Sequence, residues 1–432
     1  MILYMVDLNS APLYCRSVGI CSKSQISNFK SEIMITPVFI AGAGVISAIG
    51  NNIPENLAAL ENETAGMGEM RYLRSVHHHK LPVAEVKMSN AELAELAGMP
   101  AHISRTALLS AIAAKEALQY AAVENFGELR SGFISANTVG GMDKTEDFFI
   151  DFLNDPYKGR LRNIIHHECG AATELVADQL GIKNHISTIS TACSSSANAI
   201  FFGARLIRQN MLDVVIAGGT DALTKFTLNG FNTLMIVDQH YCQPFDENRR
   251  GLNLGEGAGY VVLVSEKVAA SLKNAPVCIL SGYCNANDAY HQTASSPDGT
   301  GSYLAMKGAL QQSGLQSAQI DYINLHGTGT QNNDIAEGTA IKMLFEGYYP
   351  PMSSTKSFTG HTLGASGGIE AVFSTLAIQH GLIYPNLRLE TPMKTLPFIP
   401  ETHFKKGAPI RNVLSNSFGF GGNCSSLIFS KA

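Results

Sequence analysis

Cys193 occupies a position at which a thiol can act as a nucleophile. It follows a β-type pattern at residues 185–190 and precedes a helical pattern at residues 194–209. A thiol at a helix start faces unpaired backbone N–H groups and the positive end of the helix dipole, and both favour the thiolate. The small residues of the run 191–199 leave room for a thioester. A buried structural cysteine is the alternative, because free cysteines are among the most buried residues.

Two histidine motifs follow the cysteine along the chain. His326 opens the run HGTGT at residues 326–330, where glycines let a substrate approach the backbone and threonine hydroxyls can bond an amide-bearing ligand. His361 lies in the run STKSFTGHTLGASGGIE at residues 354–370, together with Lys356 and Glu370. A cation, an imidazole and a carboxylate in one short span can position and polarise a carbonyl group. The two histidines therefore favour a catalytic role for the cysteine.

A glycine-rich loop supplies a fourth motif. The run NSFGFGGN at residues 416–423 follows a strand pattern, and its backbone N–H groups can face a developing oxyanion. Loss of one such donor lowers a rate by about a hundredfold to a thousandfold. Together the four motifs predict a site for chemistry on a carbonyl group.

The composition is that of a large globular chain. Its 432 residues are 45% hydrophobic and 16% charged, which predicts one big domain or two fused domains. The formal net charge of −5 offers no general basic field for nucleic acid or an anionic membrane. No uninterrupted apolar run approaches the roughly 20 residues that span a bilayer. We therefore expect a cytoplasmic protein with no nucleic-acid partner and no membrane association.

The cysteines and the histidine runs predict neither disulfides nor a metal site. The eight cysteines include no C-x-x-C pair, which suits a reducing cytosol. The histidine runs 77–79 and 166–167 lack the convergent ligands of a zinc site, so we expect no bound metal.

The N-terminal segment differs from the rest of the chain. Residues 1–33 have no hydrophobic period, and they lack the basic start, apolar stretch and cleavage site of a signal peptide. We expect residues 1–33 to be an unstructured extension, or to precede a true translation start at Met34.

Strand patterns alternate with helical patterns along the body of the chain, which predicts an α/β fold. The order of elements repeats in two halves, with Cys193 and His361 at matching places before a helix. We expect these groups to meet in one central crevice, since they lie at strand ends and helix starts. The strand patterns cover residues 38–41, 132–136, 185–190, 214–217, 259–264, 277–281, 322–325, 412–416 and 426–429, and the clearest helical patterns cover residues 54–60, 105–120, 171–180, 194–209, 303–311, 334–345 and 368–379.

The four motifs resemble, in order and spacing, the β-ketoacyl-[acyl carrier protein] synthases of the elongating, type II condensing-enzyme class. The resemblance covers about residues 35–431. It implies an α/β fold, the thiolase fold, with duplicated halves in five alternating α-β-α-β-α layers. Residues 34–275 would form the N-terminal half and residues 276–432 the C-terminal half. It also implies a decarboxylative Claisen condensation of a cysteine-bound acyl group with malonyl-acyl carrier protein, giving 3-oxoacyl-acyl carrier protein in fatty acid or polyketide-type biosynthesis.

The resemblance also implies roles for individual residues. The backbone N–H groups of Cys193 and Phe420 would form the oxyanion hole, and His326 and His361 would hold the malonyl thioester and stabilise its enolate. Two neutral imidazoles can do this in a dry pocket without quenching the carbanion. The supporting and substrate-contacting residues would be Lys356 as an orienting charge paired with Glu370, Asp334 as a second supporting group, Thr328 and Thr330 at the phosphopantetheine, Val139 at the acyl pocket, Phe418 as a further substrate contact, and Phe420 as a gate.

The resemblance extends to partners and cofactors. It implies an acyl carrier protein as partner, and a homodimer or a heterodimer with a synthase-like subunit. No cofactor is expected, because the phosphopantetheine arrives on the carrier protein, although some relatives hold a structural monovalent cation. Residues 288–291 resemble the start of a mobile loop over the entrance. The basic residue that relatives place near Thr233 for carrier-protein docking is absent, and the remaining docking candidates are Arg105, Lys225, Arg249 and Arg250.

Three other functions are open to a chain with these motifs. A non-catalytic partner subunit of a synthase usually lacks the nucleophilic cysteine, which this chain keeps. A cysteine hydrolase would need a histidine base held by a carboxylate. A thiolase-type enzyme typically has a second cysteine where this chain has His361.

Overall fold

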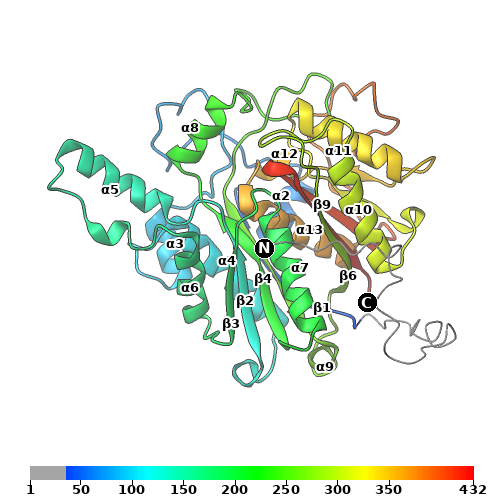
Figure 1. Ribbon diagram of the computed structural model, residues 1–432, viewed down its shortest axis with the longest axis horizontal. Helices are drawn as coiled ribbons and strands as arrows, with labels where there is room; N and C mark the ends of the chain where they lie inside the picture. The colour runs from blue at the N-terminus through cyan, green and yellow to red at the C-terminus, as the bar shows by residue number, and fades with distance from the viewer. Residues whose placement is uncertain (1–35) are drawn as a thin grey trace, which may run out of the picture. The chain divides into compact units, whose positions relative to one another are not determined.

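A computed structural model describes residues 36–432, of which residues 37–432 form one compact unit. The extension expected over residues 1–33 lies outside the described residues. A sheet runs through the unit (Figure 1). It has ten strands in the order β3-β2-β4-β5-β1-β6-β10-β9-β7-β8. The strands are β1 (Phe39–Ser47), β2 (Ser131–Ala136), β3 (His185–Ile189), β4 (Val214–Asp221), β5 (Gly257–Val264), β6 (Cys278–Asn287), β7 (Tyr322–Asn324), β8 (Met352–Ser353), β9 (Asn412–Gly419) and β10 (Asn423–Ser430).

The strand order shows that the chain is duplicated. Read outward from the centre, the first five strands and the last five strands follow the same order. Strand β2 is parallel to β3 and β4, and β7 is parallel in the same way to β8 and β9. The two halves join where β1 pairs with β6 over only two residue pairs. The predicted duplication is therefore confirmed, and it places Cys193 and His361 at equivalent points before helices α7 and α13.

Helices form three layers around the two halves of the sheet. Helices α4 and α6 pack on the outer face of the first half, α10 packs on the outer face of the second half and carries α11, and α7 and α13 lie between the halves (Figure 1). The three largest clusters of buried apolar side chains follow these layers. The expected α-β-α-β-α arrangement is thus present. The helices are α2 (Ile53–Glu61), α3 (Asn90–Ala97), α4 (Arg105–Ala121), α5 (Met142–Asn154), α6 (Cys169–Gln179), α7 (Ser195–Arg208), α8 (Lys225–Thr233), α9 (Glu266–Ala269), α10 (Thr300–Ser313), α11 (Gln331–Leu344), α12 (Lys356–Thr359) and α13 (Ser366–His380).

Helix α13 approaches β5 closely because both carry glycine at the contact. A Cβ atom added to Gly259 would lie 2.4 Å from the backbone nitrogen of Ile369, and one added to Gly368 would lie 2.4 Å from the carbonyl oxygen of Gly259. Such distances are far inside van der Waals contact, so only glycine fits. This packing fixes the height of α13 over the sheet and the positions of the residues at its start.

The helices α3, α5 and α8 and the four-residue helices α9 and α12 were not predicted from the sequence. Local capping boxes start two of them, Ser89 with Glu92 before α3 and Thr224 with Thr227 before α8. Helix α5 has no buried residue within the chain, and the apolar side chains of this amphipathic helix are exposed instead of packed on the core. None of the helices in residues 36–432 is long and apolar enough to cross a bilayer.

Candidate active site

Cys193 sits on a sharp turn between β3 and α7. Ala192, directly before it, has a φ of +53°, a left-handed conformation that turns the chain from the strand into the helix. The Oγ atoms of Ser194 and Ser195 bond back to the carbonyl oxygens of Thr191 and Ala192 at 2.8 and 2.5 Å. These bonds hold the turn, and Cys193 is buried at the end of a cavity.

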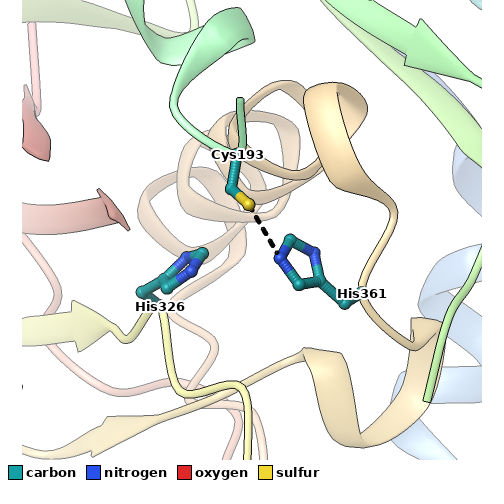
Figure 2. A group of neighbouring side chains, drawn as sticks. All are labelled: Cys193, His326 and His361. Atoms are coloured by element: carbon teal, nitrogen blue, oxygen red, sulfur yellow. Dashed lines mark hydrogen bonds between the residues drawn. The ribbon is translucent and has the colours of Figure 1, made fainter. Parts of the chain in front are cut away.

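His361 is the histidine that contacts the thiol. Its Nε2 atom lies 3.1 Å from Cys193 Sγ, as Figure 2 shows. Its Nδ1 atom accepts a hydrogen bond from the backbone N–H of Leu363 at 3.2 Å and lies 3.0 Å from Ser366 Oγ. A backbone N–H can only donate, so the neutral imidazole carries its proton on Nε2. That proton points at the sulfur and into the cavity.

His326 has the same tautomer through a different partner. Its Nδ1 atom lies 3.2 Å from Lys356 Nζ, and an ammonium can only donate. Lys356 is paired in turn with Glu370, as predicted, and both side chains are buried. The rings of His326 and His361 stand edge to face with centroids 5.4 Å apart (Figure 2). Both histidines therefore present an Nε2–H to the same space beside Cys193.

Burial controls the ionisation of this group. It lowers the pKa of His326 well below the ordinary histidine value, with further contributions from Lys356 and His361, and it lowers the pKa of His361 in the same direction with help from Lys356. Both imidazoles are therefore neutral near pH 7. Burial also raises the pKa of Glu370 to about 7, although the Lys356 ammonium opposes this shift.

Burial of the Cys193 thiol opposes the thiolate that the helix start favours. Burial raises the pKa of Cys193 to about 11, and the Lys356 charge and a hydrogen bond from the Phe420 backbone oppose this increase only in part. The helix start alone therefore does not give a thiolate in the free protein.

The glycine-rich loop lies against the nucleophile. A Cβ atom added to Gly419 would lie 3.1 Å from the backbone nitrogen of Cys193, so the absence of a side chain lets the loop approach. The backbone N–H of Phe420 points to the thiol sulfur. The Phe420 ring stacks on Phe231 of α8, with ring centroids 5.7 Å apart. The two backbone groups expected to form the oxyanion hole thus meet at Cys193, and the expected gate has an aromatic partner.

A cavity of about 400 Å³ leads to the thiol. The predicted contacts Thr328, Thr330, Phe418 and Phe420 all line it. It is bounded by residues of both halves, which agrees with the predicted central crevice. The remaining lining residues are Cys193, Phe231, Met235, Ile236, Arg250, Leu252, Thr293, Ala294, Ser295, His326, Gln331, Asn332, Asn333, His361 and Gly419.

Two carboxylates of α11 accept hydrogen bonds from the backbone of the loop at residues 326–330, which carries Thr328 and Thr330. Asp334 accepts hydrogen bonds from the backbone N–H groups of Gly329 and Phe245 at 3.2 and 2.8 Å. Glu337 accepts bonds from the backbone N–H groups of His326 and Gly327 at 2.9 and 2.8 Å. The sequence identified Asp334 but not Glu337, although a spacing of three places both on one helix face. Burial raises the pKa of Glu337 to about 7.

Some predicted residues lie elsewhere. Val139 is buried and is not among the residues that line the cavity of about 400 Å³, so its place at an acyl pocket near a dimer interface stays a prediction. Arg105 is buried in an ion pair with Glu256, and Arg249 is buried beside Asp334, so neither is free to dock a carrier protein. The reason is that each guanidinium is drawn to a buried carboxylate.

The other two docking candidates differ from each other. Lys225 lines a separate cavity with Glu146 and Asp147. The side chain of Arg250 is 53% exposed, bonds Asp238 and lines the cavity that leads to Cys193. Arg250 is thus the one of the four candidates at the mouth of the site.

Comparison with known proteins gives the family. Residues 36–269 match the model of the β-ketoacyl synthase N-terminal domain and residues 277–390 match that of the C-terminal domain. The chain is 31% identical over 410 residues to a 3-oxoacyl-[acyl-carrier-protein] synthase 2 of Staphylococcus aureus (strain COL), covering 91% of this chain and 98% of the relative. It is 32% identical over 409 residues to the protein of the same name from Synechocystis sp. (strain ATCC 27184 / PCC 6803 / Kazusa), with the same coverage.

Solved structures agree with these relatives. The ishigamide ketosynthase/chain length factor matches with a TM-score of 0.86 and 27% identity, over 92% of this chain and 99% of that chain. A ketosynthase (ApeO) in complex with its chain length factor (ApeC) from Xenorhabdus doucetiae matches with a TM-score of 0.79 and 29% identity, over 93% and 100%. The chain adopts their thiolase-like fold. It therefore belongs to the β-ketoacyl synthase family and is a condensing acyltransferase.

Proposed function

We propose that the protein condenses an acyl group bound to Cys193 with malonyl-acyl carrier protein to give 3-oxoacyl-acyl carrier protein. The main support for this function is the arrangement of the Cys193, His326 and His361 side chains in one cavity. A thiol lies 3.1 Å from one imidazole, and a second imidazole stands edge to face with the first. Both imidazoles are neutral donors, which suits stabilisation of an enolate.

The first half-reaction loads the enzyme. The sulfur of Cys193 attacks the thioester carbonyl of the acyl donor, the carbonyl oxygen takes up negative charge, and the carrier thiolate leaves. The backbone N–H groups of Cys193 and Phe420 would bond that oxygen. The carrier leaves as a thiol after taking up the proton that Cys193 loses.

The second half-reaction forms the new bond. The carbon–carbon bond to the malonyl carboxylate breaks, carbon dioxide leaves, and the electron pair passes to the thioester enolate. The Nε2–H groups of His326 and His361 would bond the enolate oxygen. The enolate carbon then attacks the acyl carbonyl on Cys193, and the cysteine thiolate leaves. Lys356 keeps His326 in the donating tautomer throughout.

A hydrolase fits the site less well. A hydrolase would require His361 to accept the thiol proton at Nε2, with a carboxylate holding Nδ1. In the structure Nδ1 is bonded by the Leu363 N–H and lies beside Ser366, so Nε2 already carries a proton. Because Cys193 and both histidines are retained, a non-catalytic partner role is disfavoured as well.

We further propose that the protein works in the cytoplasm as a dimer. Strand β3 lies at the end of the sheet, and Ile186 on it is 40% exposed. Four apolar side chains of α5 are also at least 40% exposed, Phe149, Ile150, Phe152 and Leu153. An unpaired strand edge and a helix with exposed apolar side chains each favour association. A second copy of the chain would complete this surface.

A structural monovalent cation also fits this chain. The side-chain oxygens Asn324 Oδ1 and Ser415 Oγ are buried and have no hydrogen-bond partner. Asn324 pairs with Ser415 across β7 and β9, and its amide nitrogen lies 3.3 Å from the Glu370 carbonyl oxygen. Unpaired buried oxygens are costly, and a cation such as K⁺ would satisfy them beside the catalytic Lys356.

Cation binding is testable by thermal unfolding. The protein should melt at a higher temperature in potassium chloride than in choline chloride of equal ionic strength, because a ligand bound only to the folded state stabilises that state. Asn324→Leu should lower the melting temperature and remove the difference. An equal melting temperature of the natural chain in both salts would refute the site.

The function is tested by reconstitution. The purified protein is incubated with acyl- and malonyl-carrier proteins, and the carrier-bound product is weighed by mass spectrometry. We expect a product two carbons longer than the acyl donor, with a 3-oxo group, and no product with Cys193→Ala. If the natural chain gives no condensation product with any acyl donor, alone or with a co-purified partner, the proposal is wrong.

A further inference from the structure

We propose that Glu69, His78 and His79 bind a divalent transition-metal ion such as Zn²⁺, at a site outside the catalytic cavity. One ligand atom of each residue lies within 4.8 Å of the other two. His79 Nδ1 is 3.7 Å from Glu69 Oε1, and the rings of the two histidines are 4.3 Å apart between centroids. Two imidazoles and a carboxylate form a donor set that suits zinc and its neighbours.

His78 gives a second, independent indication of a ligand. Its Nδ1 atom is buried and has no hydrogen-bond partner. A buried polar nitrogen without a partner costs free energy, and a metal bond would satisfy it. Glu69, His78 and His79 also line a common cavity of about 460 Å³, to which His240 contributes another imidazole. The cavity leaves room for water on the open side of the ion.

The backbone brings the three ligands together by closing a loop. Gly68 and Val83 exchange two backbone hydrogen bonds of 3.0 and 2.9 Å, so Glu69 near the start of the loop meets the histidines near its end. Ligand atoms of a tetrahedral zinc lie roughly 3.4 Å apart. The Glu69 and His79 side chains are 73% and 80% exposed and can rotate to reach this spacing. The sequence predicted no metal here because Glu69 lies outside the histidine run.

The loop touches the helix that borders the catalytic cavity. His77, next to the proposed ligands, contacts Asn229 of α8 with Nε2 and Oδ1 3.0 Å apart. Helix α8 carries Phe231, which stacks on Phe420. An ion that links the two ends of this loop would therefore restrict the motion of α8, which contacts Phe420 through Phe231.

The test must exclude the catalytic residues, because Cys193, His326 and His361 also offer ligand atoms within 4.8 Å of one another. The full-length Cys193→Ala variant is prepared without a polyhistidine tag, and a chelator is used to remove any bound metal. It is then titrated with Zn²⁺ by calorimetry and with Co²⁺ by visible absorption. We expect one ion per chain, with nitrogen ligation visible in the Co²⁺ spectrum.

Single substitutions then identify the ligands. Glu69→Gln and His79→Ala should each weaken binding by at least about tenfold, and both positions are exposed enough to leave folding intact. The matched controls Glu95→Gln and His403→Ala change exposed residues outside the cluster and should bind as before. No binding by the Cys193→Ala chain would overturn the proposal. The proposal would also be overturned if Glu69→Gln and His79→Ala bound the ion as tightly as the Cys193→Ala chain does, or if the two control variants lost as much affinity as the ligand variants.

Discussion

At the residue scale, two groups that can only donate a hydrogen bond determine the tautomers of the catalytic histidines. The Leu363 N–H and the Lys356 ammonium can only donate, so each histidine keeps a proton on the nitrogen that faces the cavity. Burial keeps both rings neutral. The sequence predicted which residues meet, because each lies in a distinctive motif. It could not predict tautomers or the raised pKa of Cys193, since these depend on three-dimensional burial.

The pH dependence of condensation is a prediction at this scale. Glu370, with a pKa raised to about 7, should become protonated below pH 7 and release its hold on Lys356. The rate should therefore fall as the pH drops through about 7, approaching a tenfold loss per pH unit. Titration of the two histidines should not change the rate in this pH range, because their pKa values lie well below the ordinary histidine value.

A pH–rate profile of the natural chain and of Glu370→Gln checks this assignment. The variant should be slower near pH 8 and should lack the limb near pH 7, because it has no carboxyl group to titrate. A limb of unchanged position in Glu370→Gln would show that another group is responsible.

At the element scale, the duplicated topology brings motifs from distant parts of the chain to one cavity. Cys193 before α7 and His361 before α13 occupy equivalent places, and the two helices pack between the halves of the sheet. The alternating patterns predicted most of these elements. Helix α5 was not predicted although its sequence is amphipathic, and the two-residue strand β8 is too short to give a readable pattern. The role of Val139 came from resemblance alone and stays a prediction.

The glycine contact between β5 and α13 yields a stability prediction. Gly259→Ala puts a methyl group 2.4 Å from the Ile369 backbone nitrogen, so α13 must move. We expect a loss of about 1–3 kcal/mol in the free energy of unfolding, together with slower condensation, because α13 carries Glu370. Gly230→Ala is the control, since a Cβ there meets nothing within 4 Å. Denaturant unfolding of both variants checks the difference, and equal stabilities would contradict the packing argument.

At the scale of the whole molecule, two elements of the first half of the chain leave apolar side chains uncovered at the surface. The edge strand β3 and helix α5 together expose side chains that a single copy does not bury. Composition gave no sign of this surface, because exposed and buried apolar residues count alike in a sequence.

Association through this surface is measurable by sedimentation velocity. The natural chain should sediment as a dimer, and Ile186→Lys combined with Leu153→Glu should sediment as a monomer, because buried charges without partners oppose the interface. Ile399→Glu, at another exposed apolar position, should leave the dimer intact. A natural chain that is monomeric until a synthase-like subunit is added would replace the homodimer with a heterodimer.

The thiol and the two histidines serve separate half-reactions in one cavity. Release of carbon dioxide from malonyl-carrier protein by the Cys193→Gln variant separates the two. The glutamine removes the nucleophile and leaves the Nε2–H groups of His326 and His361 in place. We predict that this variant releases carbon dioxide without forming a condensed product, and that adding His361→Ala to it abolishes the release. Carbon dioxide release that falls to the uncatalysed level in Cys193→Gln alone would contradict the account.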